Sequence, residues 1–171
     1  MNKYVKLAKT AVETYLKEGK SLSKKEKMPA EFKKRAGVFV TILDKKKLRG
    51  CVGTFLPTKD SLFEEIVGNA IMAATRDFRF EPITKKELPR LSYEVSILEK
   101  PEQIKNIKDL DAKIYGVIIR GMNSGRSALL LPDLDGLDTV EKQLAACCAK
   151  AGINPDQEEI AIHRFKTKKY I

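Results

Sequence analysis

Apolar residues recur along this chain at two spacings, one typical of helices and the other typical of strands. Between residues 2 and 18, apolar side chains such as Val5, Ala8 and Val12 fall on one face of an amphipathic helix. Between residues 91 and 97, apolar side chains alternate with polar ones, and this period of two predicts a half-buried strand. Both kinds of element are therefore expected in the fold.

The rest of the chain follows the same two patterns. Ser61 with Glu64, and Thr84 with Glu87, have the capping-box spacing that opens a helical turn. The expected elements in chain order are a helix at 2–18, a basic loop with one helical turn at 20–34, a hairpin of 36–43 and 48–55, a helix from 61 to about 76, a single turn from 84 stopped by Pro89, a strand at 91–97, a hairpin of 114–120 and 126–131, a helix from 138 to 152, and a strand at 159–165.

Hairpins dominate this order, and strands and helices do not alternate regularly. The expected fold is therefore α+β, with a largely antiparallel sheet flanked by helices. Residues 36–43 are apolar at nearly every position, which predicts a central strand covered on both faces. At 171 residues, the chain is expected to form one domain over residues 1–171, with two lobes as an option.

Composition narrows the class of protein. With 43% hydrophobic and 33% charged residues, the chain is expected to be folded, and no apolar run reaches the roughly 18 residues of a membrane helix. Residues 1–20 mix apolar and charged side chains, unlike a signal peptide. Three cysteines do not make a disulfide framework, so a reducing, cytoplasmic location is expected.

Several common motifs do not occur. The sequence has no phosphate-binding loop, no dinucleotide-binding glycine motif and no Cys-x-x-Cys spacing. His163 is the only histidine, and three cysteines are too few for an iron–sulfur cluster. No metal and no cofactor are therefore expected.

The net charge of +10 attracts phosphates and acidic partners, so a basic nucleic-acid-binding module is one possible function. The lysines are spread along the chain, however, with clusters only at Lys20–Arg35 and Lys166–Lys169. Aromatic residues make up 7% of the chain and tryptophan is absent, so platforms for base stacking are few.

The segment Leu48–Phe55 is the strongest candidate for a functional site. By strand alternation, Arg49, Cys51 and Gly53 share one face, and Gly50 lies on the other. Glycine weakens the interior of a strand, so the two glycines indicate a bulge or the close approach of a ligand or a backbone. Arg49 beside Cys51 would favour the nucleophilic thiolate. The alternative is a small core cysteine and an arginine at the surface.

The segment Arg76–Phe80 is a second candidate, because two arginines bracket a carboxylate at the end of a predicted helix. Arg76 and Arg79 could bind a carboxylate or phosphate through the forked guanidinium. In the alternative, Asp77 and the arginines form a network that fastens the loop, with Phe78 and Phe80 as anchors.

Glu94 lies on the polar face of its predicted strand. It would be a ligand-binding residue only if that face borders a cleft, and a solvated side chain otherwise. Cys147 and Cys148 fall at core spacing on the last helix and are predicted to be buried. A nucleophile–base pair of Cys51 and His163 would require the fold to bring the two residues together.

Several of these motifs together resemble the AMMECR domain family over nearly the whole chain. They are Gly37-Val38-Phe39-Val40-Thr41, Leu48-Arg49-Gly50-Cys51-Val52-Gly53-Thr54-Phe55, Ala73-Ala74-Thr75-Arg76-Asp77-Phe78-Arg79-Phe80-Glu81-Pro82, Glu87-Leu88-Pro89-Arg90-Leu91, Glu94-Val95-Ser96, Gly116-Val117, Leu130-Leu131-Pro132 and Lys150-Ala151-Gly152. Two departures are Val52, where isoleucine is commoner, and the lack of a tryptophan in residues 133–138.

The resemblance implies an α+β fold of two unequal lobes, with the Leu48–Phe55 strand at the cleft between them. Prokaryotic members resemble the A component of the AmmeMemoRadiSam system. That component accompanies a Memo-like protein and a radical S-adenosylmethionine (radical SAM) enzyme, and these are the partners that the resemblance implies. An accessory or modifying role in such a pathway is expected.

Three functions follow as hypotheses. In the first, the chain is a catalytic or ligand-binding component, in which Arg49 orients an anionic group, Cys51 is the nucleophile or a close contact, and Asp77, Arg79 and Glu94 line the pocket. In the second, the chain presents the same cleft to a protein partner without catalysing a reaction. In the third, it binds nucleic acid through its charge.

Overall fold

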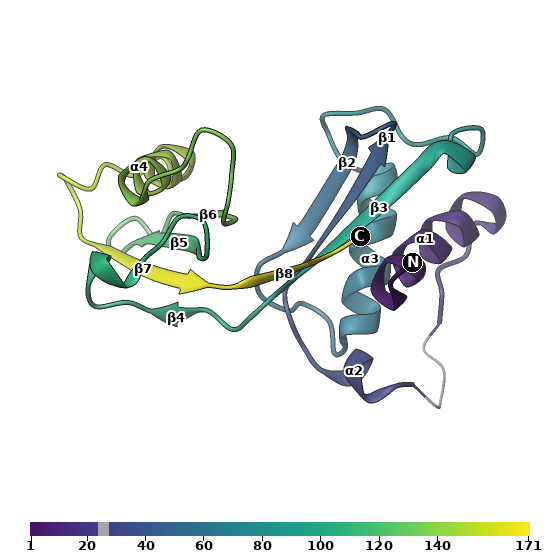
Figure 1. Cartoon of the computed structure of the whole chain (residues 1–171), viewed down its shortest axis with the longest axis horizontal. Coiled ribbons are helices and arrows are strands. Elements are labelled where there is room, and N and C mark those ends of the chain that lie inside the picture. The colour runs from purple at the N-terminus through teal and green to yellow at the C-terminus, as the bar shows by residue number, and fades with distance from the viewer. Residues whose placement is uncertain (24–27) are drawn as a thin grey trace. The chain divides into compact units, whose positions relative to one another are not determined.

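A computed structural model describes residues 1–23 and 28–171 of the chain. The chain divides into two compact units, one of Met1–Leu98 with Lys168–Ile171 and one of Glu99–Thr167 (Figure 1). The strands in the described residues form two sheets, and the strand pairs within them are antiparallel. The predicted α+β fold is therefore confirmed, although the strands make two sheets rather than one. Part of the predicted basic loop, residues 24–27, lies outside the described residues.

In the first unit, helices pack on a sheet of strand order β2-β1-β3-β8. Its elements are α1 (Lys3–Glu18), α2 (Ala30–Lys33), β1 (Val38–Asp44), β2 (Lys47–Thr54), α3 (Leu62–Thr75), the 3-10 turn η1 (Leu88–Arg90), β3 (Leu91–Leu98) and β8 (Thr167–Tyr170). β1 pairs with both β2 and β3, so it is central in the sheet, as predicted. β2 lies at one edge of the sheet.

The helix ends follow local side-chain chemistry. The Asn2 side chain accepts a hydrogen bond from the N–H of Tyr4 and caps α1, which ends at Gly19 with a φ of 72°. The Ser61 hydroxyl accepts from the N–H of Glu64 at 3.3 Å, which confirms the predicted cap of α3.

The second predicted capping box, at Thr84 and Glu87, also forms, since the Glu87 carboxylate accepts from the N–H of Thr84 at 2.7 Å. The prediction that Pro89 stops this turn was wrong, because the turn continues into η1 and Pro89 lies inside it. Proline is tolerated there because the first turn of a helix leaves its N–H groups without helical partners.

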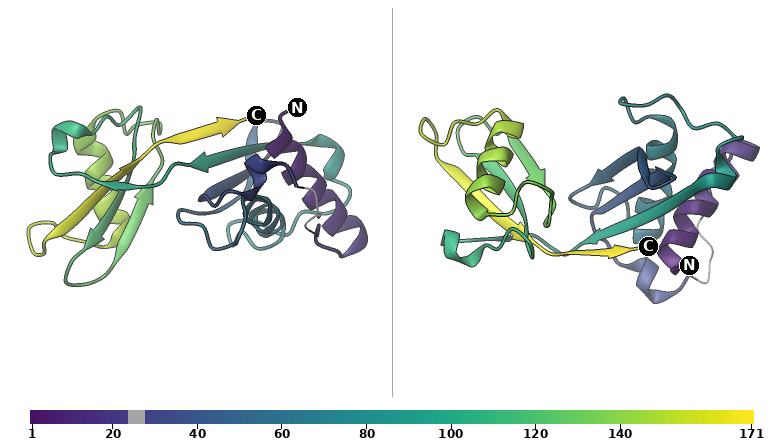
Figure 2. Two further views of the ribbon diagram at one scale, coloured as in Figure 1. Left: turned by 90° about the horizontal axis from the view of Figure 1, so that it is seen from below. Right: turned by 45° about the horizontal axis from the view of Figure 1, so that its top comes forward.

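Burial differs between the two faces of β1. Val38, Val40 and Ile42 are fully buried and belong to the apolar core of the first unit. The helices α1 and α3 cover this side of the sheet (Figure 2). The intervening Phe39 and Thr41 are only half-buried. The prediction that this strand is covered on both faces was therefore wrong, and one sheet face opposite the helices keeps partly accessible side chains.

A buried carboxylate on α3 fixes the loop that follows β2. Glu65 accepts hydrogen bonds from the hydroxyl of Thr54 at 2.6 Å and from the N–H groups of Thr58 and Lys59, each at 2.8 Å. These bonds compensate a carboxylate that is only 2% exposed. The end of β2 is therefore tied to α3 by polar as well as apolar contacts.

The second unit has a sheet of strand order β4-β7-β5-β6, with one helix packed on it. Its elements are β4 (Glu102–Gln103), the 3-10 turn η2 (Ile107–Asp109), β5 (Gly116–Gly121), β6 (Ser127–Leu130), α4 (Val140–Ala151) and β7 (Ile160–Phe165). The predicted hairpin of β5 and β6 and the predicted strand at β7 are confirmed. Val117 and Ile119 of β5 are fully buried beneath α4.

Candidate functional site

Strand register in the first unit brings Cys51 of β2 beside side chains of the neighbouring strands. Cys51 lies opposite Thr41 of β1, and Thr41 lies opposite Glu94 of β3. Directly opposed residues of antiparallel strands share one face, so these three form a row on the face opposite α1 and α3. The Cys51 Sγ and the Thr41 Oγ1 are 3.3 Å apart, which is hydrogen-bond distance for sulfur. We refer to Cys51, Thr41 and Glu94 as the Cys51 row.

Lys169 of β8 extends this row beyond Glu94, with its Nζ 3.4 Å from the Glu94 Oε2. The Glu94 side chain is 20% exposed, so it is neither fully solvated nor buried. Sequence reasoning missed both Thr41 and Lys169. The signal for Thr41 was a single hydroxyl within an otherwise apolar strand, whereas nothing in the sequence indicated that Lys169 would return to this sheet.

Side chains, rather than another strand, cover the outer edge of β2 at Cys51. The Asp77 Oδ2 accepts from the Cys51 N–H at 2.8 Å, and the Arg79 Nη2 donates to the Cys51 carbonyl at 3.3 Å. These contacts, which we call the Asp77 clamp, replace the hydrogen bonds of a further strand and protect the edge. They fasten the loop after α3 to β2, in agreement with the loop-fastening interpretation of this segment.

The clamp is charged, and its carboxylate is buried whereas its guanidinium is partly exposed. Arg79 donates from Nε to the Asp77 Oδ1 at 2.9 Å and from Nη2 to the Oδ2 at 2.7 Å, a forked pair. These bonds, with those from the backbone N–H groups of Cys51 and Arg79, outweigh the effect of burial and hold the pKa of Asp77 well below its usual range. Asp77 therefore stays ionised at neutral pH. Within the described residues, the Arg79 Nη1 makes no hydrogen bond, and the side chain is 44% exposed.

Arg49 is paired with a carboxylate rather than left free to act on the thiol. The register between β1 and β2 shifts next to Arg49, which has no partner on β1 and lies in a bulge. Its Nε donates to the Glu87 Oε1 at 2.8 Å and its Nη1 to the Glu81 carbonyl at 2.8 Å. Burial opposes ionisation of Glu87, but hydrogen bonds from Arg49 and Thr84 lower its pKa to about 2. The guanidinium that bonds directly to Cys51 is instead that of Arg79.

Both glycines of β2 are explained by close contacts within the protein. A Cβ added to Gly50 would lie 2.2 Å from the carbonyl oxygen of Ala73, so this glycine lets β2 approach the backbone of α3. A Cβ added to Gly53 would lie 2.3 Å from the ring of Phe39, which is on the same sheet face as Gly53, the face that points away from α3. A role for Gly50 and Gly53 in binding a ligand stays a prediction.

The remaining residues of the second candidate segment do not join the clamp. Arg76 ends α3 and is exposed. Phe78 is 97% exposed, so the interpretation of this ring as an anchor was wrong. Phe80 is half-buried, and the Arg79 guanidinium lies 5.5 Å from the centre of its ring.

The other cysteines behave as core residues. Cys147 and Cys148 of α4 are both buried, as predicted, and burial raises the pKa of the Cys147 thiol to about 11. His163 lies on β7 of the second unit, whereas Cys51 belongs to the first. Their pairing stays a prediction.

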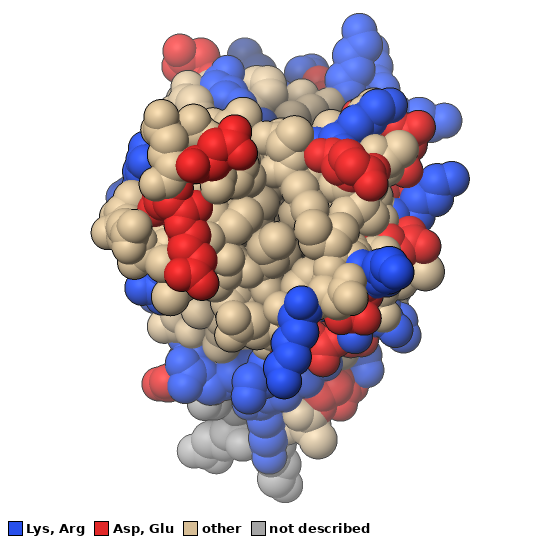
Figure 3. Space-filling view, turned by 90° about the vertical axis from the view of Figure 1, so that its left-hand side faces the viewer, with Lys and Arg blue, Asp and Glu red and all other residues tan. Residues whose placement is uncertain are grey.

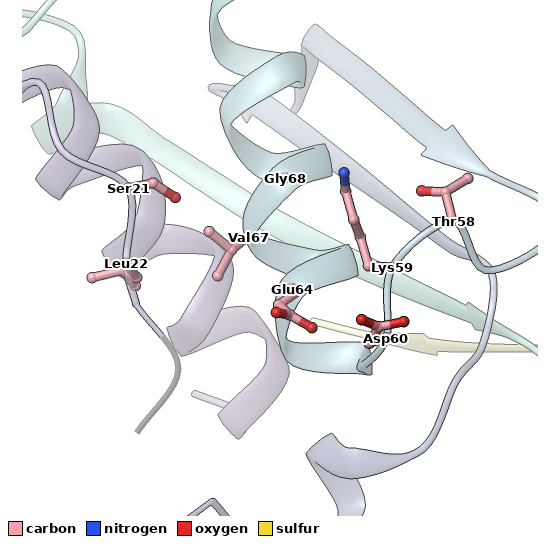
Figure 4. Close-up of a pocket in the computed structure, with 8 residues that line it drawn as sticks. All are labelled: Ser21, Leu22, Thr58, Lys59, Asp60, Glu64, Val67 and Gly68. Atoms are coloured by element: carbon pink, nitrogen blue, oxygen red, sulfur yellow. The ribbon is translucent and has the colours of Figure 1, made fainter. Parts of the chain in front are cut away.

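A separate surface pocket of about 430 Å³ lies in the first unit, away from the predicted site residues. Figure 4 shows Ser21 and Leu22 on one side of it and Thr58 and Lys59 on the other, with α3 between them. Its lining is Ser21, Leu22, Thr58, Lys59, Asp60, Glu64, Val67 and Gly68.

Over residues 1–23 and 28–171, no three His, Cys, Asp or Glu side chains lie close enough together to hold a metal ion. In the same ranges, no helix has both the length and the apolar character needed to cross a membrane.

The fold and the Leu48–Phe55 strand define the class to which this chain belongs. A profile of the AMMECR1 family matches residues 5–170, and the chain is a member of that family. A protein of Thermotoga maritima is 46% identical over 169 residues, which cover 98% of this chain and 96% of that protein. A protein of Methanothermobacter thermautotrophicus is 37% identical over 177 residues, covering 96% of this chain and 90% of its own.

A solved structure has the same fold. The crystal structure of an uncharacterized protein from Pyrococcus horikoshii matches with a TM-score of 0.84 and 34% sequence identity, and the match covers 97% of this chain and 88% of that one.

Proposed function

We propose that the chain is a ligand-binding or catalytic accessory component of a modification pathway, with its site on the Leu48–Phe55 strand. The observation that supports this best is the Cys51 row, where a thiol, a hydroxyl and a carboxylate lie side by side on the sheet face opposite the helices. The backbone of Cys51 is fixed by the Asp77 clamp. Because the backbone of Cys51 is fixed before a ligand arrives, little conformational entropy of this strand would be lost on binding.

The chemistry proposed for the site centres on the thiol. Cys51 is half-buried and not enclosed by apolar side chains alone, since its Sγ contacts the hydroxyl of Thr41. A thiol in a polar and partly accessible setting reacts more readily than one in a core. Cys51 is therefore the proposed nucleophile or closest contact, with Thr41 as its hydrogen-bonding neighbour.

A small anionic ligand is proposed to bind beside this thiol. The Arg79 Nη1 is the group offered to it, because the other donors of that guanidinium bond to Asp77 and Cys51. Arg49 contributes less directly than its position in the sequence suggests, since Glu87 neutralises it. Glu94 and Gly53 flank the same face and are proposed as lining residues.

Alkylation of the folded protein with iodoacetamide, followed by mass spectrometry of tryptic peptides, tests the accessibility of the thiol. Cys51 should be alkylated at least about tenfold faster than Cys147, because burial disfavours the Cys147 thiolate. Equal protection of both thiols in the folded protein would remove Cys51 as a site. Urea-unfolded protein, in which both thiols should react alike, is the control.

The proposed partners are a Memo-like protein and a radical SAM enzyme, and the support for them is membership of the AMMECR1 family. The absence of a complete catalytic constellation around Cys51, within the described part of the chain, favours an accessory role over independent catalysis. In a reconstituted mixture of the three proteins, Cys51→Ser and Arg79→Lys should lower product formation, and Lys105→Gln in the second unit should not. Full activity in both site variants, or no co-purification of the three under any condition, would refute this role.

The competing function, nucleic-acid binding, requires a surface on which positive charge is concentrated. On the face that Figure 3 presents, acidic side chains stand beside lysines and arginines around a middle of uncharged residues. The face in Figure 3 therefore does not support nucleic-acid binding as the role of the whole chain, and that function stays a competing prediction.

A further inference from the structure

The net positive charge of this protein resides in one of its two units. The first unit contains 23 lysines and arginines against 12 aspartates and glutamates, a net charge of +11. The second unit contains 10 against 11, a net charge of −1, and together they account for the +10 of the chain. Such an asymmetry between parts of a chain indicates that one part meets an anionic partner.

Within the first unit, the β1–β2 hairpin presents lysines in an unusual turn. Asp44 pairs with Lys47, so the loop consists of Lys45 and Lys46 alone. Both have left-handed backbone angles, with φ of 50° and 67°. A two-residue turn of this kind strongly favours asparagine and glycine, because side chains with a Cβ are strained at positive φ. Two exposed lysines therefore occupy backbone positions that are strained for residues with a Cβ, and strain of this kind is typical of functional sites.

Two further lysines stand next to this turn. Arg90, which follows the Thr84–Glu87 turn, donates from its Nε to the Asp44 Oδ2 at 2.7 Å and so ties that turn to the hairpin. Lys85 and Lys86 of the same turn are exposed. We refer to Lys45, Lys46, Lys47, Lys85 and Lys86 as the lysine tip.

The carboxylates nearest the lysine tip are mostly neutralised by arginines. Asp44 pairs with Arg90, and Glu87 pairs with Arg49. In the described residues, none of the five lysines forms an ion pair, and Glu81 is the one exposed acidic residue that precedes the Thr84–Glu87 turn closely. Lys85 donates from its Nζ to the Lys17 carbonyl at 3.3 Å, and the exposed Glu18 follows Lys17 in the sequence. Within the described residues, the other four lysines of the tip form no side-chain hydrogen bond or ion pair, so the tip presents four free ammonium groups.

We propose that the lysine tip binds the phosphate backbone of nucleic acid without reading its sequence. Lysine acts as a point charge, and the guanidinium forks that would read base edges, Arg49 and Arg90, are occupied by carboxylates. Closely spaced ammonium groups match the dense charge of nucleic acid, and release of its counterions drives such binding. An acidic protein fits less well, because protein interfaces have an apolar centre and Leu48 is the exposed apolar residue adjoining these lysines.

The test is fluorescence anisotropy with a labelled DNA duplex of about 20 base pairs, titrated at about 50 and 200 mM NaCl. The variant is Lys45→Asn with Lys46→Gly, which supplies the residues that the turn prefers and therefore preserves the hairpin. Loss of two phosphate contacts should weaken binding about tenfold or more at the lower salt concentration, and reduce the slope of log K against log salt by about 1.8.

The matched control removes the same charge from the opposite end of the unit, with Lys33→Gln in α2 and Lys34→Gln at the C-cap of that helix (Figure 1). It should change the affinity by less than about threefold, since these side chains are not expected to reach the same phosphates. An unchanged affinity in the tip variant, or an equal loss in the α2 variant, overturns the proposal. Equally tight binding of a poly-glutamate peptide of similar charge overturns it too, in favour of an acidic protein. Cys51→Ser should bind the duplex normally, so failure here is separable from failure of the proposed function.

Discussion

Replacing Asp77 with asparagine would test whether the Asp77 clamp holds the site strand in place. The carboxylate accepts from the Cys51 N–H at 2.8 Å and from Arg79 at 2.9 and 2.7 Å. Hydrogen bonds to charged groups contribute about 1.5–3 kcal/mol each when buried. Asparagine keeps one acceptor oxygen, and the partly exposed guanidinium of Arg79 can bond to water in the variant. We therefore expect the free energy of unfolding to fall by about 2 kcal/mol, which is less than the sum of the lost hydrogen bonds.

The loss of stability in Asp77→Asn should also depend on pH. The folded-state pKa of Asp77 is lower than its unfolded value, so its stabilisation is fully present above about pH 4 and declines as the pH falls below that. The difference between the natural chain and the variant should therefore shrink by about 1 kcal/mol between pH 4 and pH 3.

Urea denaturation, followed in parallel by far-UV circular dichroism and tyrosine fluorescence, measures both effects and checks whether the transition is two-state. Asp60→Asn, at an exposed aspartate of the same unit, is the control and should change stability by less than about 0.5 kcal/mol. A loss below about 0.5 kcal/mol for Asp77→Asn, or a difference that does not change between pH 5 and pH 3, would refute the clamp.

Four further variants can be measured in the same denaturation assay. Gly50→Ala should destabilise by more than about 2 kcal/mol, because its Cβ would lie 2.2 Å from a carbonyl oxygen of α3. Gly68→Ala, with nothing within 4 Å, should stabilise the same helix by about 0.5–1 kcal/mol, and equal effects would contradict this account of close approach. Glu65→Gln should cost about 2 kcal/mol, because a buried carboxylate with several donors loses its charge, and a neutral result would mean that solvent reaches it. Lys45→Asn with Lys46→Gly should stabilise the hairpin by about 1 kcal/mol, and a destabilised variant would show that the left-handed turn carries no strain.

Much of the fold could be predicted from the sequence because it depends on local chemistry. The apolar spacing of α1, the serine cap of α3 and the alternation of β3 each act within a few residues, so each was visible along the chain. The burial of Cys147 and Cys148 followed from helical spacing in the same way. The position of the candidate site on the Leu48–Phe55 strand came from its two glycines and its family motif, while its partners and ligand remain proposals.

Elements that depend on distant partners were missed. β8 is short and contains two lysines, and it is a strand because it pairs with β3 from nearly 70 residues away in sequence. Its Tyr170 also packs on Tyr4 of α1, with 4.8 Å between the ring centres. β4, only two residues long, exists through its pairing with β7. Local patterns do not contain that information.

The sequence by itself determined which segments are helices and hairpins, and which strand carries the arginine, the thiol and the glycines, because backbone propensity and side-chain periodicity are properties of neighbouring residues. The tertiary structure alone decided what those side chains meet. It paired Arg49 with Glu87, bonded Asp77 and Arg79 to the backbone of Cys51, and set Thr41 and Glu94 beside the thiol. These contacts depend on strand register and on loops that approach from elsewhere in the chain, and a shift of one residue in register would turn each strand side chain to the other face.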